Sequence, residues 1–171
     1  MPRDVVRVMG VDTALRKSGL AVVEEIGSQV RVLDASVIRC PASWLVTRCL
    51  GRLRVEVEDR LAQFQPEALA IEGVFFCRNA RTALRLGEAR GAVLAAAAHA
   101  EVPVFEYEPR LVKKAVVGWG GADKSQMIRM IAARLSLPED PQEDAADALA
   151  LALCYLQRRT TRNALGEEHP I

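Results

Sequence analysis

The pattern of apolar and polar residues predicts three strands at the start of the chain. Residues 5–12, VVRVMGVD, form a nearly continuous apolar run that ends in an acid, as in a strand that is covered on both faces. Two further runs, 18–25 and 29–38, have the composition of strands and are separated by a Gly-Ser turn. We therefore expect the domain to open with a three-stranded meander.

The rest of the chain alternates between helical and extended patterns. A helix is expected between Pro41 and Phe64, where apolar residues recur at helical spacing. Short apolar runs predict two more strands, at 67–72 and 102–107. Further helices are expected at 81–100, 109–117, 124–136 and 141–158. This order indicates an α/β fold with a mixed sheet and helices on both faces.

Length and composition indicate one globular domain. A chain of 171 residues is long enough to bury a core and too short for two domains of full size. Its content of 50% hydrophobic and 26% charged residues is that of a folded protein and not of a disordered chain. We place the domain at residues 1–158 and a polar, frayed tail at residues 159–171.

Charge is balanced overall but unevenly distributed. The formal net charge is +1, which by itself predicts binding neither to nucleic acid nor to a membrane. Residues 78–134, however, hold ten bases against five acids, whereas residues 139–147 hold five acids and no base. A basic segment is therefore followed by an acidic one.

The cysteines point to a reducing compartment. Cys40, Cys49, Cys77 and Cys154 are widely spaced, and the chain has only two histidines, so neither a zinc site nor a disulfide framework is expected. The N-terminus lacks the layout of a signal peptide, and no apolar run reaches the roughly 20 residues of a membrane span. We therefore expect a cytoplasmic protein without membrane association.

Acids occur where the pattern predicts burial. Asp144 and Asp147 lie on one stripe near the start of a helix that is otherwise rich in Ala and Leu. Asp12 and Glu72 each end an apolar strand. If these two strands are parallel neighbours, their carboxyl ends meet at one edge of the sheet, where sites form in α/β proteins. A final helix packed across the sheet would then bring all four carboxylates together.

Four converging carboxylates require a compensating charge, since they cannot all ionise at close range without one. Oxygen ligands without His or Cys favour Mg²⁺ or Mn²⁺. Two such ions about 4 Å apart would activate a water and stabilise the leaving oxygen in a phosphodiester displacement. Other interpretations remain for single residues, with Asp12 in a turn, Asp140 as a helix N-cap, Glu143 facing solvent and Asp147 in a structural salt bridge.

The order of motifs is that of a known family. GVD is followed by a Gly-containing turn, then by AIEGVFFCRNARTALRLGEARGAVL, VFEYEPRLVKKAVVGWGGADKSQM and DAADALALAL. From about Val6 to Leu156 the chain resembles the RuvC family of Holliday-junction resolvases. The resemblance implies a ribonuclease-H-like fold with a mixed five-stranded sheet, and a homodimer that makes symmetric cuts in four-way DNA junctions with Mg²⁺ or Mn²⁺. It also implies the branch-migration complex of recombination as a partner.

The resemblance assigns roles by motif. The positions of the four catalytic, metal-binding acids are Asp12, Glu72, Asp144 and Asp147. The chain departs from the family after the first of these acids, where Thr13 and Ala14 stand in place of the usual Pro-Gly and Gly19 is retained. Because glycine allows turn conformations that other residues rarely adopt, we expect the shape of this turn to differ.

Basic and aromatic residues are candidates for contact with DNA. Arg78, Arg81 and Arg85 recur at helical spacing and form either a phosphate-binding stripe or a solvated face. By resemblance, Lys113 and Lys124 contribute to the site and to binding of the DNA backbone, with Lys124 among the catalytic residues. The resemblance also implies that Phe75 stacks against a base, although an isolated aromatic in a loop more often packs into the core. The N-cap of the helix that begins at Lys124 is expected to be Asp123.

Some alternatives remain open at this point. Gly87, Gly91 and Ala95 form a smooth strip that packs either against the domain's own sheet or, as the resemblance implies, against a second copy of the chain. The alternatives for function are a module that binds branched DNA without cleaving it, another ribonuclease-H-like nuclease that acts on RNA–DNA hybrids, and a fragment of an actin-like ATPase.

Overall fold

The computed structural model describes residues 5–73, 79–165 and 169–171. Its strands are β1 (Val5–Asp12), β2 (Lys17–Ile26), β3 (Gln29–Arg39), β4 (Ala68–Glu72) and β5 (Val104–Tyr107). Its helices are α1 (Val46–Phe64), α2 (Ala80–His99), α3 (Pro109–Val117), α4 (Lys124–Arg134) and α5 (Glu143–Leu165). Every strand and helix predicted from the sequence is present, with differences at the ends.

The five strands form one mixed sheet in the order β3-β2-β1-β4-β5. The pairs β1–β2 and β2–β3 are antiparallel, as expected for a meander, and the pairs β1–β4 and β4–β5 are parallel. The expectation that the first and fourth strands are parallel neighbours is therefore confirmed. Each parallel pair needs a crossover connection, which α1 and α2 provide.

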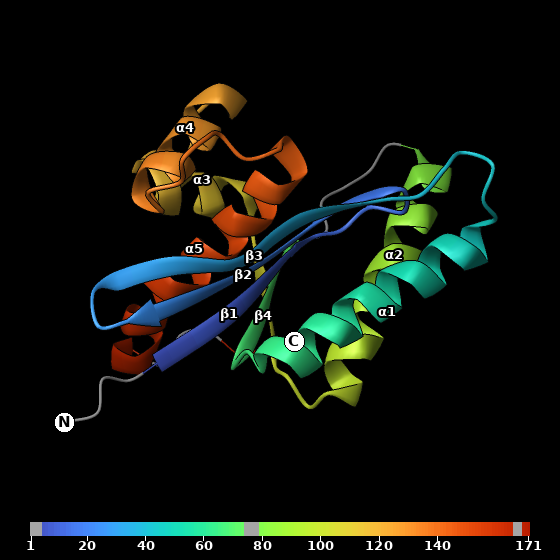
Figure 1. Ribbon diagram of the computed structural model, residues 1–171, viewed down its shortest axis with the longest axis horizontal. Helices are drawn as coiled ribbons and strands as arrows, with labels where there is room; N and C mark the ends of the chain where they lie inside the picture. Colours follow the sequence, from blue (N-terminus) through green and yellow to red (C-terminus); the bar gives the residue numbers. More distant parts are fainter. Residues whose placement is uncertain (1–4, 74–78, 166–168) are drawn as a thin grey trace.

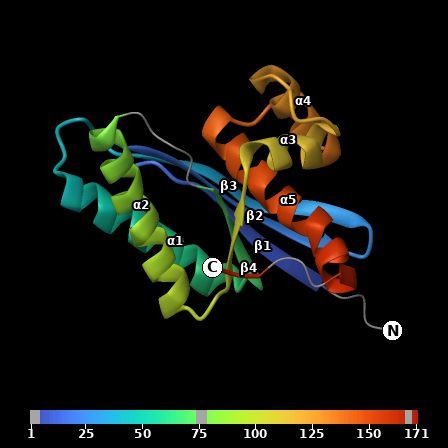
Figure 2. The same cartoon turned by 180° about the vertical axis from the view of Figure 1, so that it is seen from behind.

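Helices cover both faces of this sheet (Figures 1 and 2). One face packs against α5, which is accompanied by α3 and α4, and the other packs against α1 and α2. The alternation of side chains along β1 fits this arrangement. Val6 and Val8 belong to the core beneath α5, whereas Met9 and Val11 belong to the core beneath α1 and α2.

The backbone of α5 lies against the backbone of the sheet. A Cβ atom on Gly10 would come within 1.9 Å of the carbonyl oxygen of Ala148, and a Cβ atom on Gly19 within 1.8 Å of the carbonyl oxygen of Asp144. Only glycine fits at such distances. The many alanines of α5 have short side chains, which allow the helix axis to lie close to the sheet.

The ends of the last helix differ from the prediction. Asp140 is not its N-cap, because α5 begins at Glu143 and its first turn closes through a 2.8 Å hydrogen bond from the Ala146 N–H to the Gln142 carbonyl. The helix also continues to Leu165, so the first part of the segment predicted as a tail is helical. The N-cap at Asp123 is confirmed, since its side chain accepts a hydrogen bond from the Gln126 N–H in a capping box. Among the described residues, no helix is both long enough and apolar enough to cross a membrane.

Candidate active site

The first two candidate acids end neighbouring strands. Asp12 is the last residue of β1 and Glu72 the last residue of β4, and in the parallel pairing of these strands Val11 lies opposite Ile71. Because side chains alternate along a strand, Asp12 shares a face with Val8, and this is the face that α5 covers. Both carboxylates therefore project from one end of the sheet beneath the last helix.

The other two acids come from the first turns of α5. Gly19 lies opposite Asp12 in the antiparallel pairing of β1 with β2, and the main chain of Asp144 fits against Gly19. The missing side chain at position 19 thus allows Asp144 to approach Asp12. Asp147 lies one helical turn further along. The structure therefore gathers the four predicted acids at one end of the sheet.

Burial and mutual repulsion raise the pKa of carboxyl groups in the cluster. Burial and the negative charges of Asp147, Glu72 and Asp144 raise the pKa of Asp12 to about 7, although Lys124 opposes the shift. Burial and Asp147 also raise the pKa of Glu72. Burial raises the pKa of Asp147 too, against the opposing charge of Lys124. Negative charges within the cluster therefore hinder ionisation of Asp12, Glu72 and Asp147.

Two predicted lysines lie beside the acids. Lys124 Nζ is 3.4 Å from Asp147 Oδ2 and also contacts Glu143. Hydrogen bonding to Glu143 raises the pKa of Lys124, so its ammonium stays charged. Lys113 and Lys124 line a cavity of about 260 Å³. Its other lining residues are Glu72, Pro109, Val112, Met127, Asp147, Ala150 and Leu151. Lys113 therefore faces the same space as two of the acids.

A third lysine at the site was not predicted. Lys17, the first residue of β2, forms an ion pair with Asp144. Its position two residues before Gly19 places its side chain on the face of the sheet that α5 covers. The sequence holds a weak signal for this contact, a base just after the Asp12 turn, but it does not reveal that α5 crosses β2 there.

Arg90 was also missed as a neighbour of the site. This residue of α2 donates a 2.9 Å hydrogen bond to the backbone carbonyl of Glu72 and a 2.5 Å hydrogen bond to Glu106 Oε2. It therefore ties the end of β4 to β5 and to α2. In the sequence Arg90 cannot be told apart from the other arginines of its helix.

The remaining candidates for contact with DNA lie on or before α2. Arg81 is exposed, and Arg85 is paired with Glu88 at 2.7 Å. Phe75 and Arg78 lie outside the described residues. The Arg81 side chain thus lies in solvent, whereas Arg85 already forms an ion pair with Glu88 on the same helix.

The turn after Asp12 is closed by a side chain. Ser18 Oγ accepts a 3.1 Å hydrogen bond from the Ala14 N–H and donates one to the Ala14 carbonyl. Within the described part of the chain, the residues other than glycine with positive φ are Gln65, Glu101 and Ser136. Ala14 is not among them, so the turn formed by this chain does not require glycine at position 14, and the expected difference in shape from the family's turn stays a prediction.

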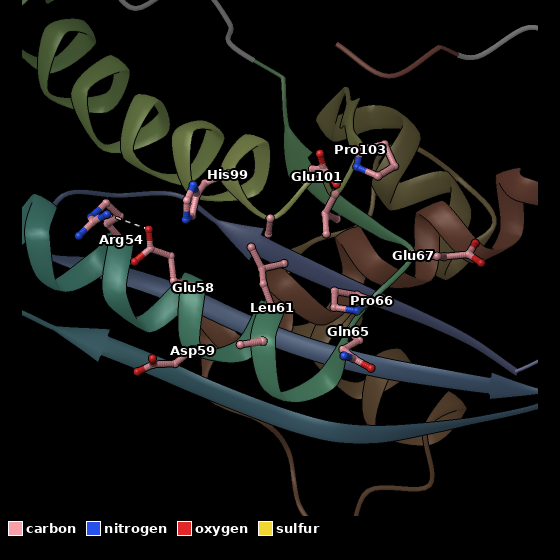
Figure 3. A pocket seen from close by; sticks show the side chains of 14 residues that line it. Arg54, Glu58, Asp59, Leu61, Gln65, Pro66, Glu67, His99, Glu101 and Pro103 are labelled. Carbon is pink, nitrogen blue, oxygen red and sulfur yellow. Dashed lines mark hydrogen bonds and ion pairs between the residues drawn. The ribbon is translucent and has the colours of Figure 1, made fainter.

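A larger cavity lies away from the acids. It has a volume of about 870 Å³ and lies between the C-terminal parts of α1 and α2, next to Glu67 and Pro103 at the starts of β4 and β5 (Figure 3). Arg54 and Glu58 form an ion pair on its wall. Since β4 runs from this end toward Glu72, the large cavity and the acid cluster occupy opposite ends of the sheet.

The acid cluster has the donor set of a divalent metal site. Its four carboxylates supply only oxygen ligands, which suits Mg²⁺ or Mn²⁺ and not zinc. Within residues 5–73, 79–165 and 169–171, however, no three acidic, histidine or cysteine side chains are already placed to share one ion. Two of the acids instead contact Lys17 and Lys124. The donors fit a metal, but the side chains must rearrange to bind it.

The fold and the acid cluster together define an α/β protein of the ribonuclease-H-like class. The family model described as crossover junction endodeoxyribonuclease RuvC matches residues 8–155. The chain therefore belongs to the RuvC family. Membership implies, in general terms, an endodeoxyribonuclease that depends on divalent metal ions.

Curated relatives and solved structures agree with this assignment. The Vibrio cholerae protein named crossover junction endodeoxyribonuclease RuvC is 44% identical over 159 residues, which are 93% of this chain and 91% of the relative. The Teredinibacter turnerae protein of the same name is 45% identical over 152 residues, or 86% of each chain. Thermus thermophilus RuvC, solved in complex with a Holliday junction substrate, is 36% identical with a TM-score of 0.87, and the match covers 97% of this chain and 99% of that one.

A more distant structure supports the fold alone. The yeast mitochondrial Holliday junction resolvase Ydc2 is 13% identical with a TM-score of 0.68, and the match covers 94% of this chain and 81% of that chain. The predicted ribonuclease-H-like fold and membership of the RuvC family are confirmed.

Proposed function

We propose that this protein resolves four-way DNA junctions by metal-dependent, symmetric hydrolysis of one phosphodiester in each of two opposed strands. The observation that carries the proposal is the gathering of Asp12, Glu72, Asp144 and Asp147 at one end of the sheet, in a chain of the RuvC family. The relative from T. thermophilus was solved with a Holliday junction substrate, which supports junction DNA as the ligand.

The four carboxylates would hold the metal. We assign them two Mg²⁺ ions, with Mn²⁺ as a substitute, because hard oxygen ligands suit both ions. When bound, the ions would activate a water and neutralise charge on the scissile phosphate. The products would carry 5′-phosphate and 3′-hydroxyl ends.

The chain's own residues would bind and orient the DNA. Lys113 and Lys124 line the cavity beside Glu72 and Asp147, so their ammonium groups can contact the phosphate next to the acids. Arg90 fixes the backbone of Glu72 and so helps to set the direction of that carboxylate.

Further contacts with DNA belong to the segment before α2 and to α2 itself. We assign backbone contacts to Arg78, Arg81 and Arg85, and base stacking to Phe75. Exposure of Arg81 supports its part in this assignment. For Arg85, contact with phosphate would compete with its pairing to Glu88.

A homodimer is part of the proposal. A Cβ atom on Gly87 or Gly91 would have no neighbour within 4 Å, and Ala95 is exposed on the same strip, so this strip does not pack against the domain's own sheet as the alternative required. Leu84, on the same helix, is 69% exposed. A second copy on α2 would cover these residues and match the two-fold symmetry of paired cuts. The same proposal includes the branch-migration complex as partner and the bacterial cytoplasm as location.

The decisive experiment removes one acid. We expect Asp144→Asn to bind a synthetic four-way junction as well as the parent protein does and to lose cleavage in Mg²⁺. The matched control is Asp59→Asn, which changes an acid in the large cavity at the opposite end of the sheet and should leave cleavage intact. Mobile and immobile junctions, with and without Mg²⁺, and a hybrid duplex would be compared on sequencing gels. Unchanged cutting by the Asp144→Asn variant would refute the site.

A further inference from the structure

Lys17 makes an ion pair that the proposed reaction does not use. Its ammonium contacts Asp144 Oδ2. The lysine side chain is 45% exposed and that of Asp144 only 15% exposed, so a partly exposed cation contacts a largely buried acid. Because β2 holds Gly19 against the main chain of Asp144, the lysine two residues earlier is held next to the same residue.

Two lysines on different elements form ion pairs with the acids in the first turns of α5. Lys17 of β2 pairs with Asp144, and Lys124 of α4 pairs with Asp147. In this arrangement no three potential ligands among the described residues share a point where an ion could sit. The ion pair between Lys17 and Asp144 must therefore break or loosen before Asp144 can bind a metal ion.

We propose that Lys17 is a built-in counter-ion that competes with the divalent metal for Asp144 and so sets the metal concentration at which the site fills. This inference rests on the proposed function, because it takes Asp144 to be a metal ligand. A fixed positive charge next to a ligand repels an incoming dication and at the same time relieves the repulsion among the acids when the metal is absent. Lys17 is thus a positioning residue, since it acts through Asp144.

The exposure of Lys17 argues against a role in stability alone. Ion pairs with a partly exposed partner add little to folding, because water screens the charge and the side chain loses freedom. The electric field at a largely buried carboxylate is screened less, so removal of Lys17 should change metal binding more than it changes folding.

The test measures metal binding by the full-length chain without DNA. Lys17→Met removes the charge and keeps much of the side-chain volume, and Lys17→Arg keeps the charge. Lys114→Met is the matched control, because this exposed lysine of α3 lines a different cavity with Gln157 and Arg158 and carries the same charge. Binding of Mn²⁺ would be followed by calorimetry and by the EPR signal of the free ion at constant pH, and Tm would be recorded with and without Mn²⁺.

We expect the Lys17→Met variant to bind Mn²⁺ about five- to twentyfold more tightly than the parent protein, with a lower metal-free Tm and a larger rise in Tm on adding metal. The Lys17→Arg and Lys114→Met variants should bind as the parent does. Equal or weaker binding by the Lys17→Met variant would overturn the inference, and a lower Tm without tighter binding would show a merely structural lysine.

The result also separates this inference from the proposed function. If Asp144→Asn weakens Mn²⁺ binding but Lys17→Met has no effect, the metal site stands and the role of Lys17 falls. If the parent protein binds no Mn²⁺, or binds it equally well after Asp144→Asn, both proposals are overturned. Should the Lys17→Met variant fail to fold, Lys17→Gln provides the same neutralisation with a polar side chain, and the same outcomes apply.

Discussion

Two carboxyl groups on the same hairpin, at opposite ends of the β1–β2 pair, have opposite surroundings. Glu24 is only 2% exposed, yet Arg31 donates a 2.7 Å hydrogen bond to it and Arg7 lies 3.6 Å away. The hydrogen bond from Arg31 lowers the pKa of Glu24. Asp12 instead lies among three other acids, and its pKa rises to about 7.

The difference separates an acid that the fold itself neutralises from an acid that we propose as a metal ligand. At Glu24 the protein supplies cations that match the buried charge, so the group is satisfied within the fold. At Asp12 the negative charges outnumber the lysines nearby, and the unmatched charge is available to an external cation. Burial alone therefore does not mark a site, whereas burial among like charges does.

The largest expected effect is on catalysis at Asp12. Asp12→Asn should lower the rate of junction cleavage at least about a thousandfold, because Asp12 is one of the four carboxylates that would hold the metal ions in the proposed site. It should also raise the metal-free unfolding free energy at neutral pH, since one repelling charge is gone. Single-turnover cleavage and urea denaturation would measure the two effects. A destabilised but active Asp12→Asn variant would erase the contrast with Glu24.

Displacement of α5 should come next. Gly19→Ala would place a Cβ atom 1.8 Å from the Asp144 carbonyl oxygen, so α5 must shift away from β2. We expect a loss of about 2 kcal/mol in stability and up to about a hundredfold in cleavage rate, because small misplacements of reacting groups are costly.

The matched change is Gly51→Ala on the exposed side of α1, where an added Cβ atom meets nothing within 4 Å. There alanine should stabilise the helix by about 0.5–1 kcal/mol and leave the cleavage rate unchanged. Equal behaviour of the two alanine variants would mean that contact at Gly19 does not position the acids.

A smaller and purely structural effect is expected at Glu24. Glu24→Gln should lower the unfolding free energy by about 2 kcal/mol. This loss is smaller than for a fully buried pair, because Arg31 is 64% exposed and water can solvate its guanidinium when the partner charge is removed. The cleavage rate of the folded protein should not change. Urea denaturation and the same cleavage assay suffice, and a Glu24→Gln variant that folds normally but fails to cut would contradict the structural role.

Per pH unit, the smallest effect is a difference in pH dependence with opposite signs for the two acids. The folded pKa of Asp12 is raised from 3.8 to about 7, so its contribution to stability is present below pH 3.8 and is lost as pH rises toward 7. In EDTA, the unfolding free energy of the parent protein relative to the Asp12→Asn variant should fall by at most about 1.4 kcal/mol per pH unit in this range.

For Glu24 the sign is reversed. Its folded pKa lies below the reference value of 4.5, so its contribution is present above pH 4.5 and is lost as pH falls through the lowered folded pKa. The parent protein should therefore gain stability over the Glu24→Gln variant as pH rises through the acid range. Denaturation curves of the parent and both variants would be recorded at several pH values. Plotted against pH, the unfolding free energy of the parent relative to each variant should have opposite slopes for Asp12→Asn and Glu24→Gln. Slopes of the same sign would contradict the different surroundings of the two groups.

Local pattern sufficed to predict the elements and the positions of the acids. Asp12 and Glu72 are recognisable because each ends an apolar strand, and Asp147 because capping does not explain an acid in the second turn of an apolar helix. The start of α5 was predicted too early, since Asp140 and Pro141 have the residue types of an N-cap and first turn. In the fold Arg39 holds Gln142 through a 2.9 Å hydrogen bond, a tertiary contact that local sequence does not contain.

Contacts across the sheet were beyond sequence pattern. The ion pair of Lys17 with Asp144 depends on where α5 crosses β2, and the hydrogen bond of Arg90 to Glu72 depends on how α2 lies over β4. Both join residues that are far apart in the chain, through a register that periodicity leaves open. The acids can be recognised from their own neighbours in sequence, whereas the bases that contact them cannot.

The glycine contacts between β1, β2 and α5 set the distance between the sheet and the last helix at the acid cluster. Main chain touches main chain at Gly10 and Gly19, so backbone geometry and not side-chain size sets the spacing of the acids. The turn between these strands and the loops at the rim can therefore diverge or be exchanged by an engineer to alter which branched structures are recognised, while the chemistry beneath them stays in place.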